Sequence, residues 1–171
     1  MRHLPKTIPR LLLLWSVVLA FGGMALAGCA RGRTEIAPPD IRYGEDVCAA
    51  CNMIISDPHF AAGYAVELKP GRYDSLAFDD IGDMLSHQAA TEQPIVAWYV
   101  HDYATEGWLD ATAAHYVVSP EIATPMGHGV AAFASAQAAT ELAADAGGRV
   151  LTWSELRTEF GATGELSHHH D

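Results

Sequence analysis

Three sulfur-bearing side chains, Cys48, Cys51 and Met53, lie within six positions of one another. Thiolate and thioether sulfurs are soft, polarisable donors, and they favour Cu(I) over hard cations. A Cys-x-x-Cys pair taken alone also suits a redox-active dithiol, half of a zinc site or a local disulfide. The segment therefore indicates soft-metal or thiol chemistry, and other features of the sequence have to distinguish between them.

Each alternative to a soft-metal site lacks part of its usual pattern. A zinc site takes four ligands, and the sequence offers no second Cys-x-x-Cys and no spaced histidine pair beyond the terminal histidines at 168–170. A thioredoxin-like dithiol begins a helix that follows a strand, whereas Cys48 and Cys51 precede the first predicted strand. A disulfide between them would close a small loop and stabilise little. We expect metal binding and keep a thiol–disulfide redox protein as the alternative.

A second group of candidate ligands is Met126 and His128, in a segment punctuated by Pro125, Gly127 and Gly129. Proline and glycine predict a loop here, and a methionine beside a histidine in a loop is poorly explained by core packing. The remaining internal histidines are scattered singly, which is typical of surface or hydrogen-bonded positions. Met84, by contrast, falls on the apolar face of a predicted helix and is expected in the core.

The N-terminus carries basic residues followed by an apolar run, as in an export signal. The run ends in Leu26-Ala27-Gly28-Cys29, which resembles the bacterial lipobox. That resemblance implies a signal peptide over 1–28 and a lipid on Cys29 that holds the protein to a membrane. Prolines and glycines make the clean apolar stretch shorter than the roughly 20 residues that a membrane span requires. Residues 29–42 lack periodicity and are expected to form a flexible tether.

The composition limits the partners of the exported part. Three of the ten basic residues lie in 1–28, so 7 Lys and Arg face 21 Asp and Glu after it, a formal net charge of −14. Such a surface disfavours nucleic acid and favours cationic cargo. It also repels anionic lipids, so membrane attachment must come from acyl chains. The length after residue 28 fits one domain.

Apolar periodicity and turn formers predict an α+β fold with antiparallel hairpins. The first expected set is a hairpin over 60–68 and 73–78, a helix over 80–90 with Asp79 as its N-cap, and a strand over 95–100. The second set is a strand over 114–118, a loop over 119–129, a helix from its N-cap Ser135 through Ala144, and a strand over 150–153. Gly147 is expected to end the second helix.

These motifs, in this order, resemble the NosL family of lipoprotein accessory factors of nitrous oxide reductase. The matching segments are the lipobox at Cys29, Asp-Val-Cys-Ala-Ala-Cys-Asn-Met at 46–53, Ala-Phe-Asp-Asp-Ile-Gly-Asp-Met at 77–84, His-Asp-Tyr at 101–103, Trp-Leu-Asp-Ala at 108–111, and Pro-Met-Gly-His-Gly at 125–129 with Ala132-Phe133. They run almost the whole length after the signal, with a copper-binding domain expected over 43–160 and a histidine-containing tail over 161–171.

The resemblance implies a periplasmic, lipid-anchored Cu(I) chaperone that supplies copper to nitrous oxide reductase together with a membrane ABC-type maturation complex. It also implies a fold of two ββαβ-like halves, a duplication that the sequence itself does not reveal. Where relatives can carry a histidine between the two cysteines, this sequence has alanine. A nitrogen ligand, if there is one, would then come from His128.

Our hypothesis for the site is a low-coordinate Cu(I) centre. Cys51 supplies the main thiolate, because Met53 would lie on its side of an extended segment. Met53 and Met126 supply thioethers, and the site is completed or gated by one of three further residues: Cys48, Asp46 or His128. The sequence shows no nucleophile–base order and no phosphate-binding glycine loop, so no enzymatic activity is expected.

Overall fold

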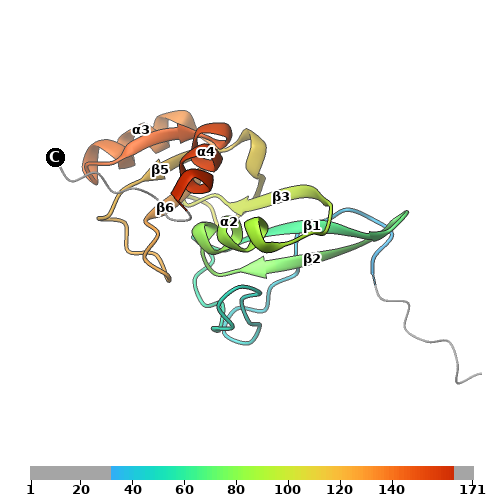
Figure 1. Ribbon diagram of the computed structural model, residues 1–171. Coiled ribbons are helices and arrows are strands. Elements are labelled where there is room, and N and C mark those ends of the chain that lie inside the picture. The colour runs from blue at the N-terminus through green and yellow to red at the C-terminus, as the bar shows by residue number, and fades with distance from the viewer. Residues whose placement is uncertain (1–31, 164–171) are drawn as a thin grey trace, which may run out of the picture. The chain divides into compact units, whose positions relative to one another are not determined.

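The computed structural model describes residues 32–163, with side chains described through residue 160 (Figure 1). The predicted signal peptide, Cys29 and the histidines at 168–170 lie outside the described residues. Within 32–163, no helix is both long and apolar enough to cross a membrane.

The first half is a four-stranded antiparallel sheet with one helix. Its strands follow the order β2-β1-β3-β4, and α2 (Ile81–Ala90) joins β2 to β3. The strands are β1 (Ala62–Lys69), β2 (Arg72–Phe78), β3 (Ile95–His101) and β4 (Trp108–Asp110). The predicted hairpin is confirmed, and Gly71 in its turn takes the positive φ of +72° that favours glycine.

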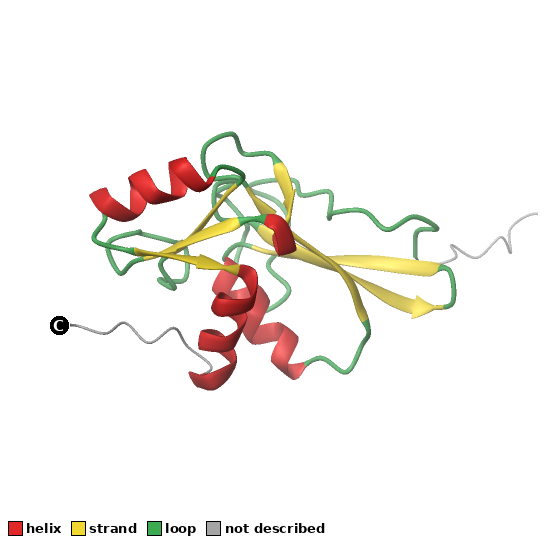
Figure 2. Cartoon of the chain, turned by 90° about the horizontal axis from the view of Figure 1, so that it is seen from above, coloured by secondary structure: helices red, strands yellow, loops and turns green. Residues whose placement is uncertain are grey.

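The second half repeats this arrangement on a smaller scale. A three-stranded antiparallel sheet has the order β6-β5-β7, and α3 (Ala136–Asp145) joins β6 to β7. The strands are β5 (His115–Val118), β6 (Val130–Phe133) and β7 (Arg149–Thr152), with a short 3-10 helix η1 (Ala111–Ala113) before them. Both halves therefore have the order ββαβ along the chain, with the first strand between the other two in the sheet. This confirms the expected α+β fold and its two halves, whose strands and helices are distinguished by colour in Figure 2.

Two sequence predictions are corrected at helix starts. Asp80, not Asp79, caps α2, because its carboxylate accepts the Gly82 N–H at 2.7 Å. The expected strand over 150–153 ends one residue early, and a helix that was not predicted, α4 (Trp153–Thr163), begins there. Thr152 and Glu155 form the reciprocal bonds of a capping box, since each backbone N–H is paired with the other's side chain.

A main apolar core joins the two halves. It contains Tyr64 and Phe78 from the first sheet, Tyr116 from the second and Leu156 from α4. Met84 of α2 is fully buried in it, which confirms the core prediction for that residue. Helices α2 and α4 pack against each other below the sheets (Figure 2). The N-terminus of α2 is thereby held against loops from both halves.

Candidate metal centre

The two cysteines lie on a tight loop that precedes the first sheet. Cys48 donates its N–H to the Met53 carbonyl at 2.8 Å, and Asn52 donates to the Cys48 carbonyl at 3.0 Å. Asn52 has a φ of +61°, a conformation that asparagine tolerates better than most residues. The Ala49 N–H donates to the carbonyl of Ala77, at the end of β2. These bonds fix both thiols beside the start of α2.

Two thiols and two carboxylates meet at this point. One ligand atom from each of Cys48, Cys51, Asp79 and Asp83 lies within 4.8 Å of all the others. The Cys48 thiol donates to Asp83 Oδ2 at 3.4 Å, and the Cys51 thiol donates to Asp79 Oδ1 at 3.6 Å. Cys48 is fully buried, Cys51 is partly exposed, and both are free thiols. We call these four residues the thiol–carboxylate cluster.

Burial controls the protonation of the two thiols. It raises the pKa of Cys48, and it raises the pKa of Cys51 to about 12. Backbone N–H groups oppose this shift: Met53 directs one at the Cys51 sulfur, and Cys51, Asp79 and Ala50 direct theirs at the Cys48 sulfur. The thiols therefore keep their protons near neutral pH, while donors that stabilise a thiolate are already in place. A soft cation that displaces the protons would meet two oriented thiolates.

The loop with Met126 and His128 comes from the second half and docks on the N-terminus of α2. His128 Nε2 lies 3.3 Å from Asp83 Oδ1, and the Met126 N–H donates to Asp80 Oδ2 at 3.3 Å. Gly82 makes this approach possible, because a Cβ there would lie 2.2 Å from His128 Cγ. Asp80 is fully buried, and burial raises its pKa.

The predicted ligands are brought together to different degrees. Cys48 and Cys51 belong to the thiol–carboxylate cluster, and His128 touches it through Asp83. Met53 and Met126 are on adjoining loops, with relative exposures of 56% and 38%. Asp46 lies outside the cluster and forms an ion pair with Arg42. The exposure of the two methionines leaves both side chains accessible to an incoming cation.

Sequence reasoning did not identify Asp79 and Asp83 as site residues. The available signal was two carboxylates four positions apart at the start of a predicted helix. The spacing alone could not predict that these two carboxylates would contact the thiols of Cys48 and Cys51.

Residues 42–160 match the family model described as NosL. The chain belongs to the NosL family. The resemblance drawn from its motifs is thereby confirmed. A NosL relative from Stutzerimonas stutzeri, named copper-binding lipoprotein NosL, is 34% identical over 155 residues, which cover 84% of this chain and 78% of the relative.

A solved NosL structure shares the fold. The crystal structure of the copper chaperone NosL from Shewanella denitrificans matches with a TM-score of 0.60 at 19% identity, over 71% of this chain and 96% of that one.

In this NosL-family chain, the thiol–carboxylate cluster offers two soft sulfur donors and two hard oxygen donors around one point. The arrangement can hold a single cation and release thiol protons to neighbouring carboxylates.

Proposed function

We propose that this protein is a lipid-anchored Cu(I) chaperone. The observation that carries the proposal is the convergence of the Cys48 and Cys51 sulfurs beside a loop with a methionine and a histidine. Two thiolates with thioether or imidazole neighbours suit Cu(I). The names of the NosL relatives, copper-binding lipoprotein and copper chaperone, support the same assignment.

In this proposal, the ligands have unequal roles. Cys51, which is partly exposed, receives the copper ion first, and buried Cys48 completes a two-coordinate thiolate pair. The thioethers of Met53 and Met126 and the imidazole of His128 serve as third donors that exchange. Asp46 acts less directly, by holding its loop through Arg42.

The carboxylates are proposed to handle the protons. Each thiol has its own acceptor, Asp83 for Cys48 and Asp79 for Cys51. When Cu(I) binds, both sulfurs lose a proton, and these neighbouring carboxylates provide the first step toward solvent. A low-coordinate site open to added ligands lets a partner's donors enter before the old bonds break, so tightly held copper can still be transferred.

The N-terminal motif and the family support a cellular setting for this activity. We propose attachment through a lipid on Cys29 on the periplasmic side of a bacterial membrane. The recipient is nitrous oxide reductase, reached with its membrane ABC-type maturation complex. The tether over 29–42 would keep the site near the membrane and raise its effective concentration there.

The burial of the thiols weighs against the redox alternative. A dithiol oxidoreductase requires an accessible thiolate with a lowered pKa, whereas here burial raises the pKa of both cysteines. Chelation by a soft cation overcomes that barrier, because the metal–sulfur bonds offset the loss of the protons.

The decisive test is an anaerobic Cu(I) competition titration of the protein that begins at Arg31 and ends at Thr163, which removes the terminal histidines. We expect Cys51→Ser to weaken binding by about 100-fold or more, since a thiolate ligand is lost. Met126→Leu should weaken it by about 3- to 30-fold, whereas Met84→Leu, a change in the core, should leave it unaltered. Equal affinity of Cys51→Ser and the unaltered protein would refute the site, and stronger binding of Zn²⁺ than of Cu(I) would refute the cargo.

A further inference from the structure

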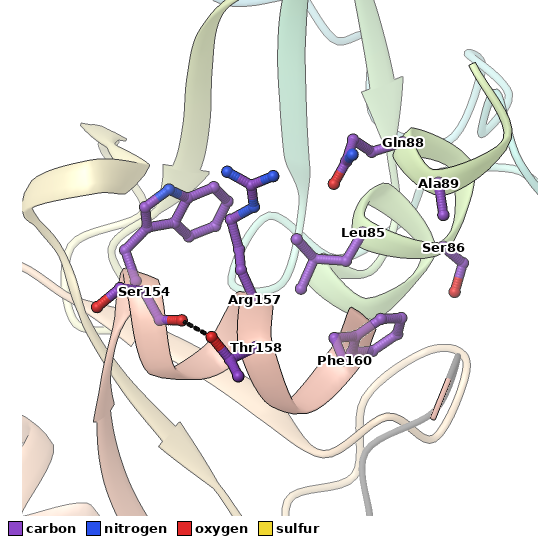
Figure 3. Close-up of a pocket in the computed structure, with 9 residues that line it drawn as sticks. Leu85, Ser86, Gln88, Ala89, Ser154, Arg157, Thr158 and Phe160 are labelled. Carbon is purple, nitrogen blue, oxygen red and sulfur yellow. Dashed lines mark hydrogen bonds between the residues drawn. The ribbon is translucent and has the colours of Figure 1, made fainter. Parts of the chain in front are cut away.

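A groove between α2 and α4 lies apart from the thiol–carboxylate cluster. It encloses about 580 Å³ and shares no residue with the cluster. This volume is within the range of about 300–1,000 Å³ that is typical of small-molecule sites. Figure 3 shows Arg157 and Phe160 rising from α4, with Leu85 and Gln88 facing them from α2.

Arg157 is held in this groove by aromatic rings. Its guanidinium carbon lies 5.3 Å from the ring centroid of Trp98 and 5.6 Å from that of Trp153. The two indoles contact each other, with centroids 5.3 Å apart. Stacking occupies the faces of a guanidinium and leaves its N–H edge free to donate. The ring contacts therefore position the cation without using its hydrogen-bond donors.

The charge of Arg157 is not neutralised by an ion pair within the described part of the chain. Arg42 pairs with Glu45 and Asp46, and Arg149 pairs with Glu159, but no described carboxylate lies within ion-pair distance of Arg157. This is notable in a sequence with 21 acidic and 10 basic residues. Arg157 is solvent-exposed at the edge of the groove, and a cation held there by ring contacts complements an anion.

The other walls limit what kind of anion would fit. The accessible apolar surface of the groove comes from Trp153 and Ala89, while Leu85 and Phe160 are each only 3% exposed at its floor. The polar groups nearby are neutral: the Gln88 amide and the hydroxyls of Ser86, Ser154 and Thr158. A single guanidinium matches one carboxylate in a two-pronged pair, and apolar walls favour an apolar remainder. A polyphosphate or other multiply charged anion would lack further cations.

We propose that this groove binds a small organic carboxylate, with the carboxylate on Arg157 and the apolar body against Trp153 and Ala89. The proposal does not rest on copper binding, since the groove contains none of the cluster residues, and a contact between the two regions runs from Phe160 to His128, with ring centroids 5.6 Å apart. It assigns the protein a second ligand site of different chemistry.

The test is calorimetric titration of the copper-free full chain in non-ionic detergent at pH 7, with phenylacetate as the probe and phenylacetamide as its uncharged control. Phenylacetate should bind and phenylacetamide should bind at least about tenfold more weakly, because the charge-assisted pair is missing. Arg157→Gln should reduce phenylacetate affinity about tenfold or more. Arg72→Gln, the charge-matched change at the start of β2, should alter it less than about twofold.

A second variant guards against loss of folding in Arg157→Gln. Ala89→Trp, at an exposed position on the rim, fills the groove and keeps Arg157. It should abolish phenylacetate binding while the circular dichroism spectrum is retained. The proposal is overturned if phenylacetate does not bind, if phenylacetamide binds equally well, or if Ala89→Trp binds like the unaltered chain.

Discussion

At the scale of single residues, Gly82 lacks a side chain at the point where His128 packs against α2. Glycine inside a helix normally costs about 0.5–1 kcal/mol relative to alanine. Here the absent Cβ leaves the space in which His128 lies against α2, at a point where a Cβ would be 2.2 Å from His128 Cγ. The contact also places His128 beside Asp83 of the thiol–carboxylate cluster.

Gly82→Ala should therefore destabilise the protein, against the usual helix preference. We expect a loss of about 1–3 kcal/mol in the free energy of unfolding, because the His128 loop must move away. Urea denaturation measures this loss. Gly107→Ala is the matched control: its Cβ would meet no atom closer than 3.5 Å, so a change within about 0.5 kcal/mol is expected. Stabilisation of the protein by Gly82→Ala would contradict the docking of His128 on α2.

The raised pKa values of the two thiols lead to a pH prediction. A thiol reacts as its thiolate, and burial raises the pKa of Cys51 to about 12 and that of Cys48 above its ordinary value. In the folded, copper-free protein, alkylation by iodoacetamide at pH 8 should be at least about tenfold slower than in the urea-unfolded chain, whose thiols titrate near 8.5. Mass spectrometry follows both rates.

The raised pKa values of the two thiols also determine how protein stability changes with pH. The folded state holds the thiol protons more tightly than the unfolded chain, so the contribution of these groups to stability is complete below the ordinary thiol pKa. It declines as pH rises above that value.

In the alkylation experiment described above, rapid reaction of the folded protein with iodoacetamide at pH 7 would instead favour the thiol–disulfide redox function.

At the scale of elements, the start of α4 depends on a four-residue signal. The capping box of Thr152 and Glu155 ends β7 and begins a helix that contributes Leu156 to the core and Arg157 to the groove. The sequence Thr152-Trp153-Ser154-Glu155 matches the pattern for such a start, yet the apolar run before it favoured a longer strand.

Thr152→Ala should lower the free energy of unfolding by about 1 kcal/mol, since the N-cap hydroxyl is lost. Thr158→Ala offers the comparison within the same helix. Its hydroxyl bonds only to the Ser154 carbonyl at an exposed position, and alanine is the better helix former, so no loss is expected. Thermal or urea unfolding of both variants checks the difference. An equal change in the free energy of unfolding for the two variants would mean that the capping box does not stabilise the start of α4.

At the scale of the whole molecule, each half supplies part of the candidate metal site. The first half contributes the start of α2 and the thiol loop, and the second contributes the Met126 and His128 loop through bonds to Asp80 and Asp83. Neither half alone contains all the residues of this candidate site. The shared core around Tyr64 and Tyr116 holds the two halves together and so keeps the two loops next to each other.

The lipid anchor and the copper site should be separable. Cys29→Ser in the full chain removes the proposed acylation site and should move the protein from the membrane fraction to the soluble fraction, because the proposal assigns the whole attachment to acyl chains on this residue. The Cu(I) affinity of the released protein should match that of the anchored one within about twofold. Fractionation with immunodetection measures the first outcome. Membrane retention of the variant would point to another attachment.

The sequence by itself determined the features that depend on neighbours along the chain. The Cys48 and Cys51 pair, the first hairpin and the family all follow from local motifs and periodicity, and the same kind of motif gives the lipobox-like segment that ends at Cys29. The cap of α2 was misplaced by one residue, since Asp79 and Asp80 are both good caps and only the observed bond to Gly82 separates them.

Tertiary structure alone decided what surrounds the sulfurs. Cys51 meets Asp79 across 28 positions and Cys48 meets Asp83 across 35, and His128 reaches Asp83 across 45. No local pattern encodes such pairings, because they depend on how β2, α2 and the second half pack around a common core. The same packing buries the thiols, raises their pKa values and leaves Arg157 stacked on two indoles in a groove between helices.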